Sequence, residues 1–148
     1  MSRVPLTDEE TRVIFAGEAA ANFGALEGSE QQQVINRLVD VLDNEVKPSS
    51  LVHERIGNLD IYTAGDQIRL YTKVVDEIPR GNAEYHVIYL FYIDDDHDYP
   101  HRKLATYSPR AEEKAERVTS LKTVTDVEEY LAAQNAMDVD DLRDLLQQ

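Results

Sequence analysis

The fold is decided by Leu59-Asp-Ile-Tyr62, Ile68-Arg-Leu-Tyr-Thr-Lys-Val-Val75 and Glu84-Tyr-His-Val-Ile-Tyr-Leu-Phe-Tyr-Ile93, three apolar runs in the middle of the chain. The turn signals Ala64-Gly-Asp-Gln67 and Pro79-Arg-Gly-Asn82 separate them. A period of two predicts strands, and the nearly continuous apolar character of the last run is typical of a buried central strand. We therefore predict a meander of three antiparallel strands.

A strand and two helices are predicted before the meander. Thr11-Arg-Val-Ile-Phe15 is rich in β-branched residues and predicts a first strand, and residues 17–26 are rich in alanine and predict a helix. Ser29 is a suitable N-cap for a second helix over residues 30–44. The apolar stripe of that second helix comprises Val34, Ile35, Leu38, Val41 and Leu42. Two helices joined by a tight break should form an antiparallel hairpin.

Three further helices are predicted after the meander. Ser108-Pro109 places an N-cap before a proline at the first helical position, which predicts a helix that ends at Leu121. Thr125-Asp-Val-Glu128 is a capping box for another helix, and Asp138 can cap a last short one.

These elements predict an α+β domain, in which a twisted antiparallel sheet carries the N-terminal helical hairpin on one face. We assign the domain to residues 1–121 and an acidic helical extension to residues 122–148. Packing on or beside the domain is the expected role of the extension. Self-association, or covering a basic groove by mimicking RNA, are the alternatives.

The charge balance of the chain is strongly acidic. The formal net charge is −14, from 29 acidic and 15 basic residues, while 42% of the residues are hydrophobic. Only five of the basic residues are lysines: Lys47, Lys73, Lys103, Lys114 and Lys122. An acidic, lysine-poor surface around an apolar core is what we expect of a halophilic protein that folds in concentrated salt. A partly disordered acidic protein is the alternative, which the apolar central runs disfavour.

The sequence also restricts the compartment and the chemistry. The chain contains no cysteine, which excludes disulfides and thiolate metal sites. The first ten residues lack the apolar stretch of a signal peptide, and no apolar run approaches the roughly 20 residues of a membrane helix. We therefore expect a soluble, cytoplasmic protein.

Several segments match a known pattern in their order and spacing. Residues 12–26 and 31–38 combine a strand with two helices, and Ile61-Tyr-Thr-Ala-Gly-Asp-Gln-Ile-Arg-Leu-Tyr71 combines an aromatic residue, Gly-Asp and an arginine on a strand pair. Leu90-Phe-Tyr-Ile93 and Pro100 follow. Over residues 11–118 the chain resembles the RelE/ParE/HigB superfamily of toxin–antitoxin systems, and the last two segments resemble its HigB branch.

The resemblance implies a metal-independent mRNA endonuclease that uses the 2′-hydroxyl of the RNA as nucleophile and needs no cofactor. It implies an antitoxin protein and RNA or the ribosome as partners and no membrane association, and it leaves a homodimer open. Arg69 matches the arginine that holds the scissile phosphate, and histidine or tyrosine would move protons. The candidate catalytic residues are Arg69, His97, His101 and Tyr107, and the candidate RNA-binding residues are Arg69, Lys73, Arg102 and Arg110.

The chain departs from the family pattern at two places. Thr63 stands where the family usually has an arginine before Gly-Asp, and Asp94, Asp95 and Asp96 stand where the HigB branch carries two lysines. Adjacent carboxylates repel RNA phosphates. The departures favour a second reading, a non-catalytic binding module that kept the toxin fold and contacts a protein or ribosomal partner.

Each candidate also has a purely structural interpretation. Arg69 could pair with a carboxylate such as Asp60 or Asp66, and residues 94–98 could bind a hard cation or form an acidic surface turn. The strand aromatics could stack on bases or pack in the core; they are Tyr85, Tyr89, Phe91 and Tyr92.

Overall fold

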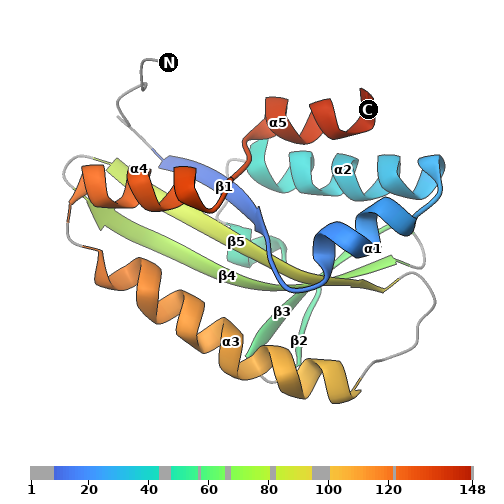
Figure 1. Ribbon diagram of the computed structural model, residues 1–148, viewed down its shortest axis with the longest axis horizontal. Coiled ribbons are helices and arrows are strands. Elements are labelled where there is room, and N and C mark those ends of the chain that lie inside the picture. The colour runs from blue at the N-terminus through green and yellow to red at the C-terminus, as the bar shows by residue number, and fades with distance from the viewer. Residues whose placement is uncertain are drawn as a thin grey trace.

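The computed structural model describes residues 9–43, 48–56, 58–65, 68–80, 83–94, 101–121 and 123–147, and in these ranges five strands form one sheet with helices on both faces (Figure 1). The strands are β1 (Glu9–Phe15), β2 (Glu54–Ile56), β3 (Leu59–Ala64), β4 (Ile68–Arg80) and β5 (Ala83–Asp94). The helices are α1 (Ala19–Ala25), α2 (Gly28–Asp43), α3 (His101–Ser120), α4 (Val124–Ala133) and α5 (Val139–Asp144), with short 3₁₀ helices at Pro48–Leu51 and Leu145–Gln147. None of these described helices combines the length and apolar character of a membrane span.

The order of strands in the sheet is β1-β5-β4-β3-β2. β3, β4 and β5 pair antiparallel, so the predicted meander is confirmed. β1, however, pairs parallel with β5, with Val13 opposite Ile88, and the expectation of a wholly antiparallel sheet is wrong at this edge. A parallel neighbour needs a long connection, and here α1, α2 and the meander supply it.

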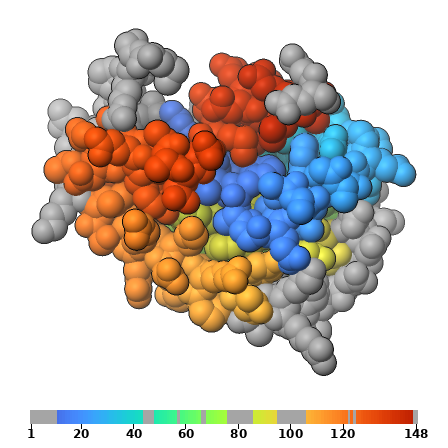
Figure 2. Space-filling view, viewed as in Figure 1, coloured from blue at the N-terminus to red at the C-terminus, as the bar shows by residue number. Residues whose placement is uncertain are grey.

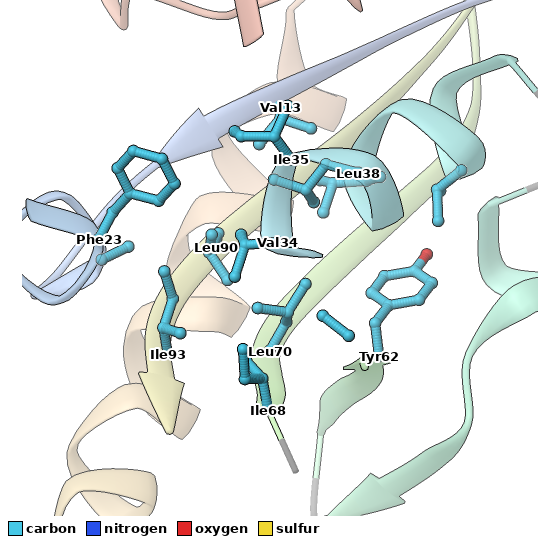
Figure 3. Close-up of a cluster of buried hydrophobic side chains, with 14 of the residues drawn as sticks. Val13, Phe23, Val34, Ile35, Leu38, Tyr62, Ile68, Leu70, Leu90 and Ile93 are labelled. Carbon is cyan, nitrogen blue, oxygen red and sulfur yellow. The ribbon is translucent and has the colours of Figure 1, made fainter. Parts of the chain in front are cut away.

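The first face of the sheet is covered by α1, α2 and α5. The helical stripe predicted for α2 is confirmed, because Val34, Ile35, Leu38 and Val41 are all buried. They pack against the sheet residues drawn in Figure 3, among them Val13, Tyr62, Ile68, Leu70, Leu90 and Ile93. The N-terminal hairpin therefore lies on one face of a mostly antiparallel sheet.

The opposite face of the sheet is covered by α3 and α4. Buried side chains of both helices join a second core with strand residues of that face; the helical members include Tyr107, Ala111, Val118, Val127, Tyr130 and Leu131. The sequence did not predict this second layer. Both faces of β5 are consequently buried, which explains its nearly continuous apolar character.

The helix boundaries correct two predictions. α3 begins at His101 and contains Pro109 in its interior, whereas the sequence had placed the start at Ser108. The proline removes one backbone hydrogen bond, and the buried side chains that α3 lays on the sheet offset this loss. The N-cap of α4 is Thr123, whose hydroxyl accepts from the backbone N–H of Asp126 at 3.0 Å, instead of Thr125.

The C-terminal segment contributes to both cores. Asp138 is the N-cap of α5 as predicted and forms a capping box with Asp141, and α5 buries Leu142 completely against the first face. Just before α5, the backbones of Val13 and Met137 exchange two hydrogen bonds, of 3.0 and 2.8 Å. These contacts attach residues 123–147 to the free edge of β1.

Candidate functional site

Arg69 lies in the middle of a strand and is surrounded by acidic groups. Its neighbours across the sheet are Thr63 on β3 and Asp94 on β5. Its Nη1 lies 3.5 Å from the Oε1 of Glu54, a residue of the edge strand β2, and its side chain is 18% exposed. Of the two expected partners, Asp60 is instead paired with Arg55 at 3.0 Å, and Asp66 lies outside the described residues.

Asp94 is buried, which contradicts the interpretation of an acidic surface turn at this residue. Only 2% of it is exposed, and the hydroxyl of Tyr71 donates to its Oδ2 at 3.5 Å. A buried carboxylate is costly unless charge and hydrogen bonds compensate it, and Arg69 is its cross-strand neighbour. The charge of Arg69 is therefore opposed by two carboxylates. Asp95 and Asp96 lie outside the described residues.

Tyr107 projects from α3 and is almost completely buried, with 3% exposed. Its hydroxyl donates to the carboxylate of Glu18, which precedes α1. Burial, followed by this hydrogen bond, raises the pKa of Tyr107 above its ordinary value. The ring packs on Phe91 and Tyr92, at centroid distances of 5.6 and 6.3 Å. Tyr107 is therefore held as a neutral donor to a group of the chain itself.

Arg69 and Tyr107 are linked only through other side chains in the described part of the molecule. Tyr71 contacts Asp94, the rings of Tyr71 and Tyr92 lie 6.1 Å apart, and Tyr92 contacts Tyr107. The structure thus places these two candidate residues at the two ends of one polar and aromatic cluster. The sequence did not identify the carboxylates of Glu18 and Glu54 that engage them.

Two of the remaining candidates have described side chains, and of these only Arg110 acts on the cluster, where its charge lowers the pKa of Tyr107 against the larger effects of burial and Glu18. The Nζ of Lys73 lies 3.5 Å from the backbone oxygen of Asn58, and Arg110 is exposed on α3. His101 and Arg102 lie in the first turn of α3, but their side chains, like all of His97, lie outside what the structure describes. No site is therefore assembled from the described members of the predicted set.

Two alternatives concerning ligands can be examined directly. Tyr89 and Phe91 are buried in the second core, and the hydroxyls of Tyr89 and Tyr130 share a hydrogen bond of 2.7 Å. These rings therefore pack in the core and are not available to stack on bases. Within the described ranges, no group of three or more histidine or acidic side chains could hold a metal ion.

Two hollows of the described surface lie beside Phe15, at the end of β1. One hollow of about 580 Å³ lies between α1 and the segment that joins α4 to α5, and a second of about 350 Å³ lies between β1 and α3. Phe15 and Gln134 line both hollows, so we treat them together as the Phe15 groove. Figure 2 shows the side of the molecule where α1, α3 and α4 meet around it.

No local sequence pattern marks this groove. Phe15 was interpreted only as a strand residue, and the walls come from segments far apart in the chain. The one available signal was the spacing of Arg110 and Lys114, which places two cations on the same face of α3.

No protein-family model, curated protein or solved structure matches this chain.

Proposed function

We propose that this chain is a non-catalytic binding domain, built on an arrangement of elements that resembles the RelE-type toxins. The observation that carries the proposal is the position of Arg69, the candidate phosphate-holding residue, which has Glu54 at 3.5 Å and Asp94 as its cross-strand neighbour. An arginine that stabilises a phosphoryl transition state must direct its charge at the substrate. Here, instead, carboxylates of the chain itself lie beside the positive charge of Arg69.

The candidate for proton transfer supports the same conclusion. A general acid acts best when its pKa lies near the working pH and its proton points at the reacting group. Tyr107 has a raised pKa, and its proton is donated to Glu18. Both properties are those of a structural tyrosine that fixes α3 against the start of α1.

An RNA endonuclease is the second candidate, and one observation favours it. Among the described residues, the buried Nε and Nη1 atoms of Arg69 have no hydrogen-bond partner. Unsatisfied donors of a charged group are costly, and the oxygens of an RNA phosphate would satisfy them.

The two candidates are distinguished by mapping RNA ends. We expect the purified protein to leave no new ends on total RNA in molar potassium chloride, and its expression to leave growth unaffected. Glu54→Gln should not create cleavage, although it frees Arg69 from its ion pair. New ends that Arg69→Ala abolishes would refute the proposal. Arg55→Ala is the matched control, because this arginine is also ion-paired in the same sheet but was not a candidate.

A further inference from the structure

One half of the Phe15 groove is an apolar hollow. The rings of Phe15 and Phe23 meet edge to face at a centroid distance of 6.0 Å, and Met137 and Leu145 form the opposite wall. Its volume of about 580 Å³ falls in the range of about 300–1,000 Å³ that holds small molecules. Asp141 lies at the rim, where its carboxylate already accepts from the backbone N–H of Asp138.

The other half of the groove carries cations, which are scarce in this chain. Arg110 and Lys114 line it from successive turns of α3, over a base formed by Phe91 and Gly17. Among the described residues, no carboxylate forms an ion pair with either cation. The exposed Glu113 lies at the same rim. Within this half, the two lining cations outnumber the one lining carboxylate.

Gly17 lines the cationic half and packs tightly against the protein. A Cβ atom at this position would lie 3.0 Å from the backbone oxygen of Phe91 and 3.0 Å from the ring of Tyr107. The absence of a side chain therefore allows the backbone of Gly17 to lie close to β5 and Tyr107.

We infer that the Phe15 groove binds a small apolar molecule that carries a single carboxylate. The apolar part lies between Phe15, Phe23 and Met137, and the carboxylate faces Arg110 and Lys114. Asp141 at the far end fixes this direction, because it repels an acid group and leaves only the α3 end for it. This inference rests on the proposed binding function and names the class of ligand.

Calorimetric titration with decanoate tests the inference, with decanol and decylamine as probes of the same chain length and different head group. Decanoate should bind, and decanol and decylamine should bind at least several-fold more weakly. The double variant Arg110→Gln/Lys114→Gln removes both cations and should raise the Kd of decanoate about tenfold. This is the effect expected from losing charge-assisted contacts at a half-exposed site. The Kd of decanol should not change.

Two further variants separate the groove from general effects. Arg117→Gln removes the same charge from the exposed surface of α3 outside the groove and should leave the Kd of decanoate within twofold. Ala20 is an exposed residue of α1 that lines the apolar half. The substitution Ala20→Trp should fill the hollow and abolish decanoate binding, and circular dichroism should show that the chain stays folded.

The results also separate this inference from the proposed function. Absence of decanoate binding, equal or tighter binding of decanol or decylamine, or no effect of the paired Gln substitutions would overturn the ligand class. These outcomes are read from ligand binding alone and do not involve RNA cleavage, so they leave the proposed function untouched. Cleavage that depends on Arg69 would overturn the binding function, whatever decanoate does.

Discussion

Replacing two glycines by alanine should change stability in opposite directions. Gly17 has a φ of +52°, a left-handed conformation that costs a residue with a Cβ about 1 kcal/mol. The new methyl would also lie 3.0 Å from the backbone oxygen of Phe91, which cannot move without disturbing β5. We expect Gly17→Ala to lower the free energy of unfolding by about 2 kcal/mol in total.

Gly24 provides the matched control. It lies in α1, and no atom lies within 4 Å of the Cβ that alanine would add. Because alanine favours the helix over glycine, Gly24→Ala should raise the free energy of unfolding by about 0.5 kcal/mol near this helix end. The two variants should therefore differ by about 2.5 kcal/mol, which is about seventyfold in the unfolding constant.

Urea denaturation in molar potassium chloride, followed by far-ultraviolet circular dichroism, measures both free energies. The reasoning is refuted if the free energy of unfolding of Gly17→Ala lies within about 0.5 kcal/mol of the wild-type value. It is also refuted if both variants shift the midpoint in the same direction with unchanged slope.

Three other measurements examine the surface, the buried tyrosines and the C-terminal helix. The melting temperature should rise from dilute buffer to molar potassium chloride, because salt screens the mutual repulsion of the carboxylates, and a flat or falling value would contradict salt adaptation. Burial and hydrogen bonds raise the pKa of Tyr89 and Tyr107, so above the ordinary value of 10.0 the unfolded chain releases protons that the folded chain keeps. Stability should therefore be constant just below pH 10 and fall above it by about 1.4 kcal/mol per pH unit for each tyrosine, and Tyr107→Phe should make the fall shallower in an alkaline urea series. Leu142→Ala should cost about 3 kcal/mol because this side chain is completely buried, whereas the exposed Arg143→Ala should cost less than about 0.5 kcal/mol in the same urea assay.

Local periodicity was sufficient to predict the meander and α2. In both cases the apolar spacing is a property of neighbouring residues, and the sheet only had to bury the face that the spacing defines. The direction of β1 could not be predicted in this way, because a strand has the same sequence pattern beside a parallel or an antiparallel neighbour. The start of α3 was missed because Pro109 is typical of a first turn, and burial of Tyr107 decided otherwise.

The candidate site was only partly predictable, because its electrostatics depend on residues distant in sequence. Asp60 was the natural partner for Arg69 by proximity, but it accepts from Arg55 and from the backbone N–H of Val74 at 2.9 Å. Glu54 reaches Arg69 from a three-residue edge strand. No local pattern marks such an approach, and the walls of the Phe15 groove have the same origin.

The position of β1 has a consequence for how the chain is made. The strand neighbour of Val13 on β5, Ile88, follows 75 positions later in the chain. On the other side of β1, the backbone of Val13 is hydrogen-bonded to Met137. At a synthesis rate of about 5–20 residues per second, the nascent chain grows for roughly 4–15 s before β5 follows β1 out of the ribosome. During that interval α1 and α2 have no complete sheet to cover, because β5 lies inside it, between β1 and β4, and parts of their apolar stripes stay exposed to chaperones and proteases. The first strand to be synthesised is therefore among the last to take its place.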